Sequence, residues 1–423
     1  MWTKKSVLVL GLGASLTFLG LVFRSLALMM TSIILLSYLL ISVYLVRVSR
    51  VVPARKISSE KLFEDGDISV QLSLHNKSLT RTGFLEVRDK MPKQIDVKEG
   101  SNYLILDMRG GERTTINYRL VAPLRGIYQI GPVNLRSQDV YANYYDEVSV
   151  EDINTITVFP RVEEVKDITI KAKSLKLYPG ATPVKRPGAG SEFFLVRDYL
   201  PGDPFKNINW KQYASKGRLL VNEHEVEAVS DVVLILDARE FSKYGTEANS
   251  SIMYGARAAA TMTNFFLKRR DSVGLIIYGD KLLTIKQGGG QKQLFEVLTA
   301  LSGAKAEGTL PFKGVVDYTA PFLPKRSPIM IISSLDGDDS FSEGVSTLRV
   351  LEYPVIIICP SSVEFEMQAR AKTRQGIGDT LPYEILKLER DIILSDLRGY
   401  GANVIDWDPK TPLLAVLRET KRI

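Results

Sequence analysis

Two long uncharged runs at the amino terminus limit what this chain can fold into more than any other feature. Residues 6–23 and 25–46 contain 18 and 22 residues without a charged side chain, and Arg24 separates them. A helix of that length spans the roughly 30 Å hydrocarbon core of a bilayer, the first run only just. The sequence therefore predicts a transmembrane hairpin of two helices within residues 1–55.

The charges beside these runs indicate their orientation. Lys4 and Lys5 precede the first run, and four basic residues follow the second: Arg47, Arg50, Arg55 and Lys56. Because Lys and Arg concentrate on the cytoplasmic side of membrane helices, we expect a two-span protein of the cell membrane with the bulk of the chain in the cytoplasm. Two alternatives stay open: the first run is a secretory signal peptide, or it does not span and the large domains face outward.

Residues 56–162 carry the period-two alternation of half-buried strands, separated by polar turns. Five strands are expected, at 68–74, 84–87, 114–120, 127–130 and 156–159. Several short strands at this spacing favour an immunoglobulin-like β-sandwich.

Residues 231–423 show a different pattern, in which near-continuous apolar strands alternate with amphipathic helices. The strands are expected at 232–236, 273–278, 282–285, 329–332, 355–359 and 403–406, and the helices at 249–268, 291–301, 342–351, 383–398 and 411–419. This order predicts a mainly parallel, doubly wound α/β sheet. Ligands bind such sheets at the carboxyl ends of the strands, so the residues after the first strand are the first candidates for a site.

Composition excludes several classes of function. The net charge of +7 is spread along all 423 residues with Asp and Glu interspersed, so nucleic-acid binding is not expected. Cys359 is the only cysteine, and His75 and His224 are the only histidines. One cysteine and two histidines exclude internal disulfides, thiolate metal clusters and most histidine-based catalysis, and no cofactor is expected.

The stretch 188–227 is dense in charge, Gly, Pro and aromatic residues. Its ordered pattern is formed by Gly188, Gly190, Glu192, Phe193, Arg197, Tyr199, Pro201, Gly202, Asp203, Ile208, Trp210, Lys211, Leu219 and Glu227. This pattern resembles domain-of-unknown-function family 58, a group of membrane proteins with a von Willebrand factor A-like (vWA-like) domain. Residues 125–133 resemble the segment that precedes the signature in that family, and we expect them to form a hairpin.

The residues of the signature also permit an interpretation without the family. Pro201, Gly202 and Asp203 form a turn cluster, and charged residues alternate with aromatic ones around it. Because buried charges are tolerated when they are paired, we interpret 163–230 as a connector with a buried polar clasp between two domains. An exposed functional surface is the alternative. The residues predicted to be structural are Gly190, Glu192, Arg197, Tyr199, Pro201, Gly202, Asp203, Trp210 and Lys211.

The end of the first α/β strand resembles a degenerate metal site. A vWA-type site presents Asp-x-Ser-x-Ser, whose hydroxyls bind a hard cation such as magnesium. Asp237 keeps the acidic position, but Arg239 and Phe241 replace both serines, so we expect no metal and a pair between Asp237 and Arg239 instead. Thr309 resembles a later ligand, Ser334 holds the position of the last one, and Asp336 lies two residues late. The predicted partner-binding residues are Asp237, Arg239, Phe241, Thr309, Ser334 and Asp336.

These features predict a membrane-anchored, non-catalytic interaction protein. The family resemblance implies a MoxR-type AAA+ ATPase as partner, in chaperone-like or complex-assembly work. Two alternatives stay open. One is a hydrolase that uses carboxylates near Asp203 or Asp237, and the other is an outward-facing adhesion protein, which an intact metal motif would favour.

Overall fold

The computed structural model describes residues 2–45, 50–79, 81–139, 143–165, 182–228, 231–371 and 381–419. Within these ranges, the side chains of 43–45, 182–194, 224–228, 370–371, 381 and 418–419 lie outside the description. The protein is multidomain, and two compact units divide it: Met1–Phe159 and Pro160–Ile423.

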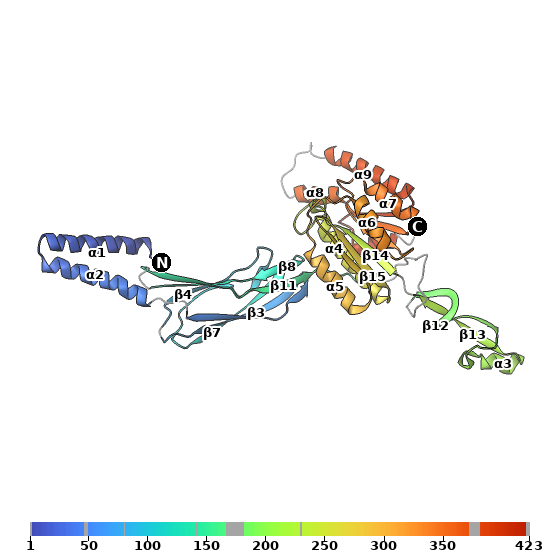
Figure 1. Cartoon of the computed structure of the whole chain (residues 1–423), viewed down its shortest axis with the longest axis horizontal. Coiled ribbons are helices and arrows are strands. Elements are labelled where there is room, and N and C mark those ends of the chain that lie inside the picture. Colours follow the sequence, from blue (N-terminus) through green and yellow to red (C-terminus); the bar gives the residue numbers. More distant parts are fainter. Residues whose placement is uncertain are drawn as a thin grey trace. The chain divides into compact units, whose positions relative to one another are not determined.

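The amino-terminal unit begins with two apolar helices, α1 (Lys4–Val22) and α2 (Leu26–Leu45), which lie side by side (Figure 1). Their contact uses small residues, because Ser32 Oγ donates to the carbonyl of Gly13 at 2.8 Å. Among the described helices, only α1 is long and apolar enough to cross a membrane. The apolar part of α2, Leu26–Ser42, is shorter. One candidate span is thus present, and the second stays a prediction.

The rest of this unit is rich in β-structure. Its strands are β1 (Val51–Ile57), β2 (Lys61–Phe63), β3 (Gly66–Asn76), β4 (Phe84–Asp89), β5 (Asp96–Glu99), β6 (Tyr103–Leu106), β7 (Arg113–Ala122), β8 (Gly126–Ile130), β9 (Val133–Gln138), β10 (Tyr145–Val150) and β11 (Asn154–Phe159). They form sheets of order β1-β3-β7-β5, β10-β9-β4-β6 and β2-β11-β8. All five predicted strands are confirmed. The hairpin predicted for 125–133 is wrong, because β8 pairs with β11 while β9 joins a different sheet.

A buried ion pair lies in this β-rich region. Arg55 donates from Nε and Nη2 to the two carboxylate oxygens of Asp89, and neither side chain has any exposed surface. Tyr118 donates its hydroxyl to the same carboxylate at 2.5 Å. Strand β1 begins at Val51, inside the segment predicted as the transmembrane hairpin. Arg55 was counted as a charge at the membrane surface, and that interpretation is wrong because the residue belongs to the β-core.

The carboxyl-terminal unit contains a six-stranded mixed sheet of order β16-β15-β14-β17-β18-β19. Its strands are β14 (Asp231–Asp237), β15 (Ser272–Tyr278), β16 (Leu282–Gly288), β17 (Ile329–Ile332), β18 (Val355–Pro360) and β19 (Asn403–Trp407). All neighbours are parallel except β15 and β16, which are antiparallel. Every predicted strand of this region is therefore confirmed.

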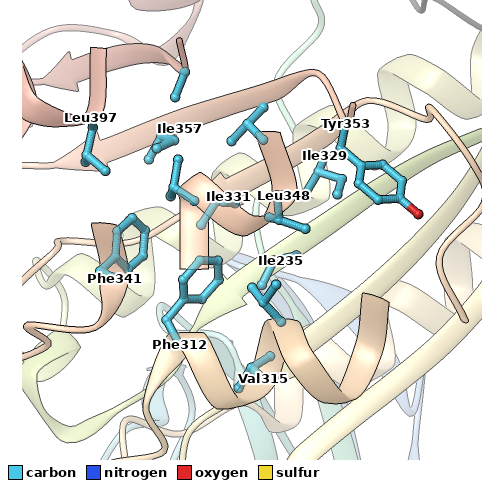
Figure 2. Close-up of a cluster of buried hydrophobic side chains, with 14 of the residues drawn as sticks. Ile235, Phe312, Val315, Ile329, Ile331, Phe341, Leu348, Tyr353, Ile357 and Leu397 are labelled. Atoms are coloured by element: carbon cyan, nitrogen blue, oxygen red, sulfur yellow. The ribbon is translucent and has the colours of Figure 1, made fainter. Parts of the chain in front are cut away.

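Helices cover both faces of this sheet: α4 (Ser251–Lys268), α5 (Gly290–Gly303), α6 (Phe312–Thr319), α7 (Phe341–Val350), α8 (Ser362–Ala371), α9 (Leu381–Gly399) and α10 (Leu413–Glu419). The α4 helix lies on one face, where a Cβ in place of the Gly255 hydrogen would lie 2.9 Å from Leu236 and 3.3 Å from Ile332. The opposite face packs against α6, α7 and α9 in the cluster of Figure 2, where Ile235, Ile331 and Phe341 are buried. The sequence predicted these helices except α6 and α8.

A long antiparallel hairpin precedes the sheet. Strands β12 (Thr182–Asp198) and β13 (Leu220–Ala228) form it, and the short helix α3 (Trp210–Lys216) lies in its connection (Figure 1). The sequence interpretation of 163–230 as a connector did not predict that this segment forms a hairpin. The backbone of Gly190 and Glu192 lies in β12, but their side chains are outside the described part.

Candidate functional site

The candidate site lies where the winding of the sheet reverses. The chain leaves β14 for β15 on one side and later returns to β17 on the other side of β14. The carboxyl ends of β14 and β17 are therefore neighbours; Asp237 is the last residue of β14, and Ser333 directly follows β17. Crevices at such switch points are the usual ligand sites of open α/β sheets.

A closed network of ion pairs fills this crevice. Arg239 donates from Nε to Asp237 Oδ1 at 2.9 Å and from Nη2 to Asp237 Oδ2 at 2.6 Å, which is a bidentate pair. Its Nη1 lies 2.8 Å from Asp338 Oδ2. The Ser333 hydroxyl donates to Asp237 Oδ2 at 2.7 Å. The structure thus confirms the pair expected between Asp237 and Arg239 and adds a second carboxylate that the sequence did not reveal.

Asp338 joins this network to two helices. Its Oδ2 accepts from the backbone amide of Phe312, the first residue of α6, at 2.8 Å. Its Oδ1 accepts from the amide and the hydroxyl of Ser340, just before α7, at 3.0 and 2.6 Å. One carboxylate therefore holds Arg239 and the starts of both helices, which favour negative charge at their amino ends.

Burial and the neighbouring charges act in opposite directions on the pKa of Arg239. Burial alone would lower the pKa of Arg239, but the hydrogen bond to Asp237 and the surrounding charges raise it above its usual value. The guanidinium lies over the ring of Tyr278, 5.4 Å from its centroid. Burial also raises the pKa of Tyr278 well above its usual value. Arg239 is therefore a permanent cation held between two carboxylates and an aromatic face.

The residues of this crevice do not fit a bound cation. The guanidinium already occupies both carboxylates, and two serine ligands of the metal motif are absent. Thr309 is exposed, although its loop pairs with the 237–241 segment through the Glu240 amide and the Gly308 carbonyl at 3.0 Å. In the part of the chain that the structure describes, no group of three or more His, Cys, Asp or Glu residues could hold a metal ion.

Arg239 cannot receive a partner's carboxylate directly. The residue is 2% exposed, and its donors are engaged within the chain. The prediction that the Arg239 guanidinium binds a partner is therefore wrong, because the guanidinium is not accessible to one. The partner role of the neighbouring residues stays a prediction.

A cleft of about 510 Å³ lies beside the buried network. Phe241, Ser334 and Asp336 of the predicted site line it, so the structure brings these three together. Its other acidic residues are Asp338, Asp339, Glu366 and Glu389, against the single basic residue Arg390, and its apolar lining includes Tyr244, Leu386 and Ile393. Burial raises the pKa of Asp336, whose Oδ1 accepts from the Ser362 hydroxyl at 3.0 Å. The cleft is acidic and partly apolar.

The signature residues form an ordered ion-pair cluster on the hairpin. Arg197 donates from Nη1 and Nη2 to the two oxygens of Asp203 at 2.7 and 2.8 Å, and from Nε to Glu223 at 2.5 Å. The hydrogen bonds from Arg197 and from the Leu200 amide lower the pKa of Asp203 to about 2. This pair closes the turn of Pro201 and Gly202, as a structural role requires.

The expectation that the whole signature is buried is wrong. Trp210 is 57% exposed and Lys211 is also exposed, so the clasp is not a core element. Tyr199 is half-buried and stacks on the exposed Phe205, with ring centroids 6.4 Å apart. Trp210 contacts Tyr213 edge to face at 6.1 Å. The aromatic residues of the signature therefore form a surface.

Comparison with known proteins agrees with part of the sequence resemblance. Residues 195–350 match the family model "Protein of unknown function DUF58". The DUF58 match covers the exposed aromatic surface, β14 and the network of Arg239. The "Uncharacterized protein YeaD" of Bacillus subtilis (strain 168) is 22% identical over 226 residues, which are 52% of this chain and 54% of that protein. The chain thus matches about half the length of this relative.

Two solved structures show weak likeness. Manganese-loaded TRAP protein of Plasmodium vivax is 14% identical, with a TM-score of 0.27; the match covers 36% of this chain and 65% of the TRAP chain. The cupredoxin domain of amoB from Nitrosocaldus yellowstonii is 10% identical, with a TM-score of 0.19; the match covers 27% of this chain and 89% of the amoB domain. At these TM-scores neither likeness carries an argument.

Three residues of the network within the DUF58 match escaped sequence reasoning: Tyr278, Ser333 and Asp338. The run Asp336–Asp339 directly after a buried strand was the available signal. Within this run, the Asp338 side chain is 4% exposed and pairs with Arg239.

Proposed function

We propose that this chain is a membrane-anchored interaction protein, with an immunoglobulin-like β-sandwich and a vWA-like α/β domain whose metal site has been replaced by an internal cation. The observation that supports it is the Arg239 network. A guanidinium bound to Asp237 and Asp338 stands at the switch point where a metal-dependent domain would hold its cation. Two membrane helices, the second within α2, would keep the bulk of the chain in the cytoplasm.

The chemistry of the cleft supports a partner with a basic docking element. Because its exposed carboxylates outnumber its cations, we expect the docked element to offer Lys or Arg side chains beside apolar ones. The family resemblance implies a MoxR-type AAA+ ATPase as the protein that carries this element. Docking of this kind needs neither a metal ion nor a nucleic acid.

The hydrolase alternative has less support. It would use carboxylates near Asp203 or Asp237, and these two residues are each engaged by an arginine in a bidentate pair. An ion pair of this kind fixes a carboxylate in place and occupies both of its oxygens, which favours a structural role for both.

Capture of partners by the detergent-solubilised full chain tests the proposal. Capture of an AAA+ ATPase should persist in EDTA, because the proposed contact contains no metal ion. The captured ATPase should dissociate as the salt concentration rises, because salt screens exposed charges. Asp339→Lys with Glu389→Lys reverses the exposed charge of the cleft and should abolish capture. Glu60→Lys with Glu296→Lys makes the same change in charge on exposed residues elsewhere and should preserve capture. Loss of capture in EDTA, or equal behaviour of both double variants, contradicts the proposal.

A further inference from the structure

The tip of the β12–β13 hairpin exposes an unusual set of side chains. Large apolar residues stand in solvent there, with Phe205 at 72% and Trp210 at 57% exposed, together with Leu200, Tyr213 and Leu219. Contiguous exposed apolar surface on an ordered element marks an interaction site. We call this surface, residues 199–219, the signature tip.

The signature tip is also basic. Its exposed cations are Lys206, Lys211, Lys216 and Arg218, and none of them makes an ion pair with the residues that the structure describes. The one carboxylate inside the tip, that of Asp203, is taken up by Arg197. The free charge of the tip is therefore positive.

The tip is held in one shape. The bidentate pair of Arg197 and Asp203 closes the turn, and the Asn209 side chain caps α3 through the Gln212 amide at 3.1 Å. Gly217 ends α3 with a left-handed φ of 64°. A preordered surface loses little conformational entropy on binding. Its exposed aromatic rings are thus available as anchors.

The acidic cleft has the complementary properties. Asp339 and Glu389 are exposed at it and make no ion pair within the described residues, while Phe241, Tyr244 and Ile393 supply apolar lining. Its volume of about 510 Å³ is in the range of pockets that enclose bound groups. A basic element with aromatic side chains satisfies both the charge and the apolar surface of this cleft.

We propose that the signature tip of one copy docks in the acidic cleft of a second copy. The two surfaces are different, so the contact is head-to-tail and can link further copies. Trp210 or Phe205 would fill the apolar part of the cleft, and Lys206 and Lys211 would meet Asp339 and Glu389. This self-association is a property of the purified chain and does not depend on the ATPase partner proposed above.

Charge exchange between the two surfaces tests the contact. Lys206→Glu with Lys211→Glu makes the tip acidic, and Asp339→Lys with Glu389→Lys makes the cleft basic. Each variant of the detergent-solubilised full chain is studied alone, and then as an equimolar mixture, by sedimentation velocity over a concentration series. All four residues are exposed, so folding should be retained; an unchanged circular dichroism spectrum checks this.

The unmodified chain should associate with rising concentration, and each variant alone should associate at least about tenfold more weakly, a difference of about 1.4 kcal/mol. The mixture should recover association, because an acidic tip then meets a basic cleft. Lys281→Glu with Lys305→Glu, two exposed cations outside the tip, should behave like the unmodified chain.

Three outcomes overturn the proposal. The first is that each micelle holds a single copy at all concentrations, which is also the result expected if the tip docks in the cleft of its own chain. The second is association that neither exchange weakens or that mixing fails to restore. The third is a tip variant with unchanged association that loses binding to phosphatidylglycerol vesicles, which would assign the tip to anionic lipid.

Discussion

Removal of the internal cation should destabilise the α/β domain strongly. Arg239→Met keeps most of the side-chain volume but leaves two carboxylates without a counter-charge. The side chains of Asp237 and Asp338 are 2% and 4% exposed, so water cannot replace the guanidinium. Removing one partner of a buried ion pair costs about 3–5 kcal/mol for this reason.

The hydrogen bonds that remain limit the loss to that range. Asp237 keeps the Ser333 hydroxyl, and Asp338 keeps the amides of Phe312 and Ser340. We therefore expect a loss of about 3–5 kcal/mol for Arg239→Met rather than twice that value. Asp237→Asn and Asp338→Asn added to this variant remove the stranded charges, and the triple variant should regain about half of the loss or more.

The buried Trp407 offers a local assay. The chain has three tryptophans, so Trp2→Phe with Trp210→Phe leaves Trp407 as the fluorophore of the α/β domain. Urea unfolding of the full chain in detergent then gives the change in the free energy of unfolding at constant slope. Arg326→Met is the matched control, because Arg326 pairs with Glu352 on the surface at 2.7 Å and should cost at most about 1 kcal/mol. Equal losses for both variants would refute the reasoning.

Three further predictions concern other buried or paired groups. Arg55→Met should lower the stability of the β-rich region by about 3–5 kcal/mol, since it strands Asp89, and calorimetry of the full chain should show the loss in one transition. Burial raises the pKa of Cys359 to about 12, so a thiol reagent at pH 8 should label it in urea and not in the native chain. The pKa of Asp203 is lowered to about 2, so its pair with Arg197 stabilises the hairpin above about pH 4, and this stabilisation is lost as pH falls toward 2. NMR titration of the Asp203 carboxyl carbon checks this, and a titration midpoint near pH 4 contradicts it.

Strand and helix positions were predictable where burial alone sets the pattern. β3 alternates buried and exposed residues, and β14 is buried throughout, so both are evident as runs of apolar residues. β5 has four exposed residues and no apolar period, and α6 has only eight residues. Elements like these are held by tertiary pairing that a short window of sequence does not contain.

The site was predictable only in its local part. Asp237 and Arg239 are two residues apart, so their pair could be expected from position. Asp338 approaches Arg239 only because the parallel order of β14 and β17 brings two carboxyl ends together. The exposure of Trp210 also depends on tertiary packing, because an aromatic residue among charges suits a clasp and a binding surface equally.

A cation that belongs to the chain changes what this edge of the sheet can bind. A metal ion held by hydroxyl and carboxylate ligands keeps open positions, and it can accept a carboxylate from a partner. Arg239 has no open position, because its donors are bound to Asp237 and Asp338, and it cannot dissociate. The exposed charge of the crevice is then set by Asp339 and Glu389, which lie outside the network. Under our proposal, the replacement therefore reverses the preferred partner from acidic to basic, and salt rather than metal concentration controls docking.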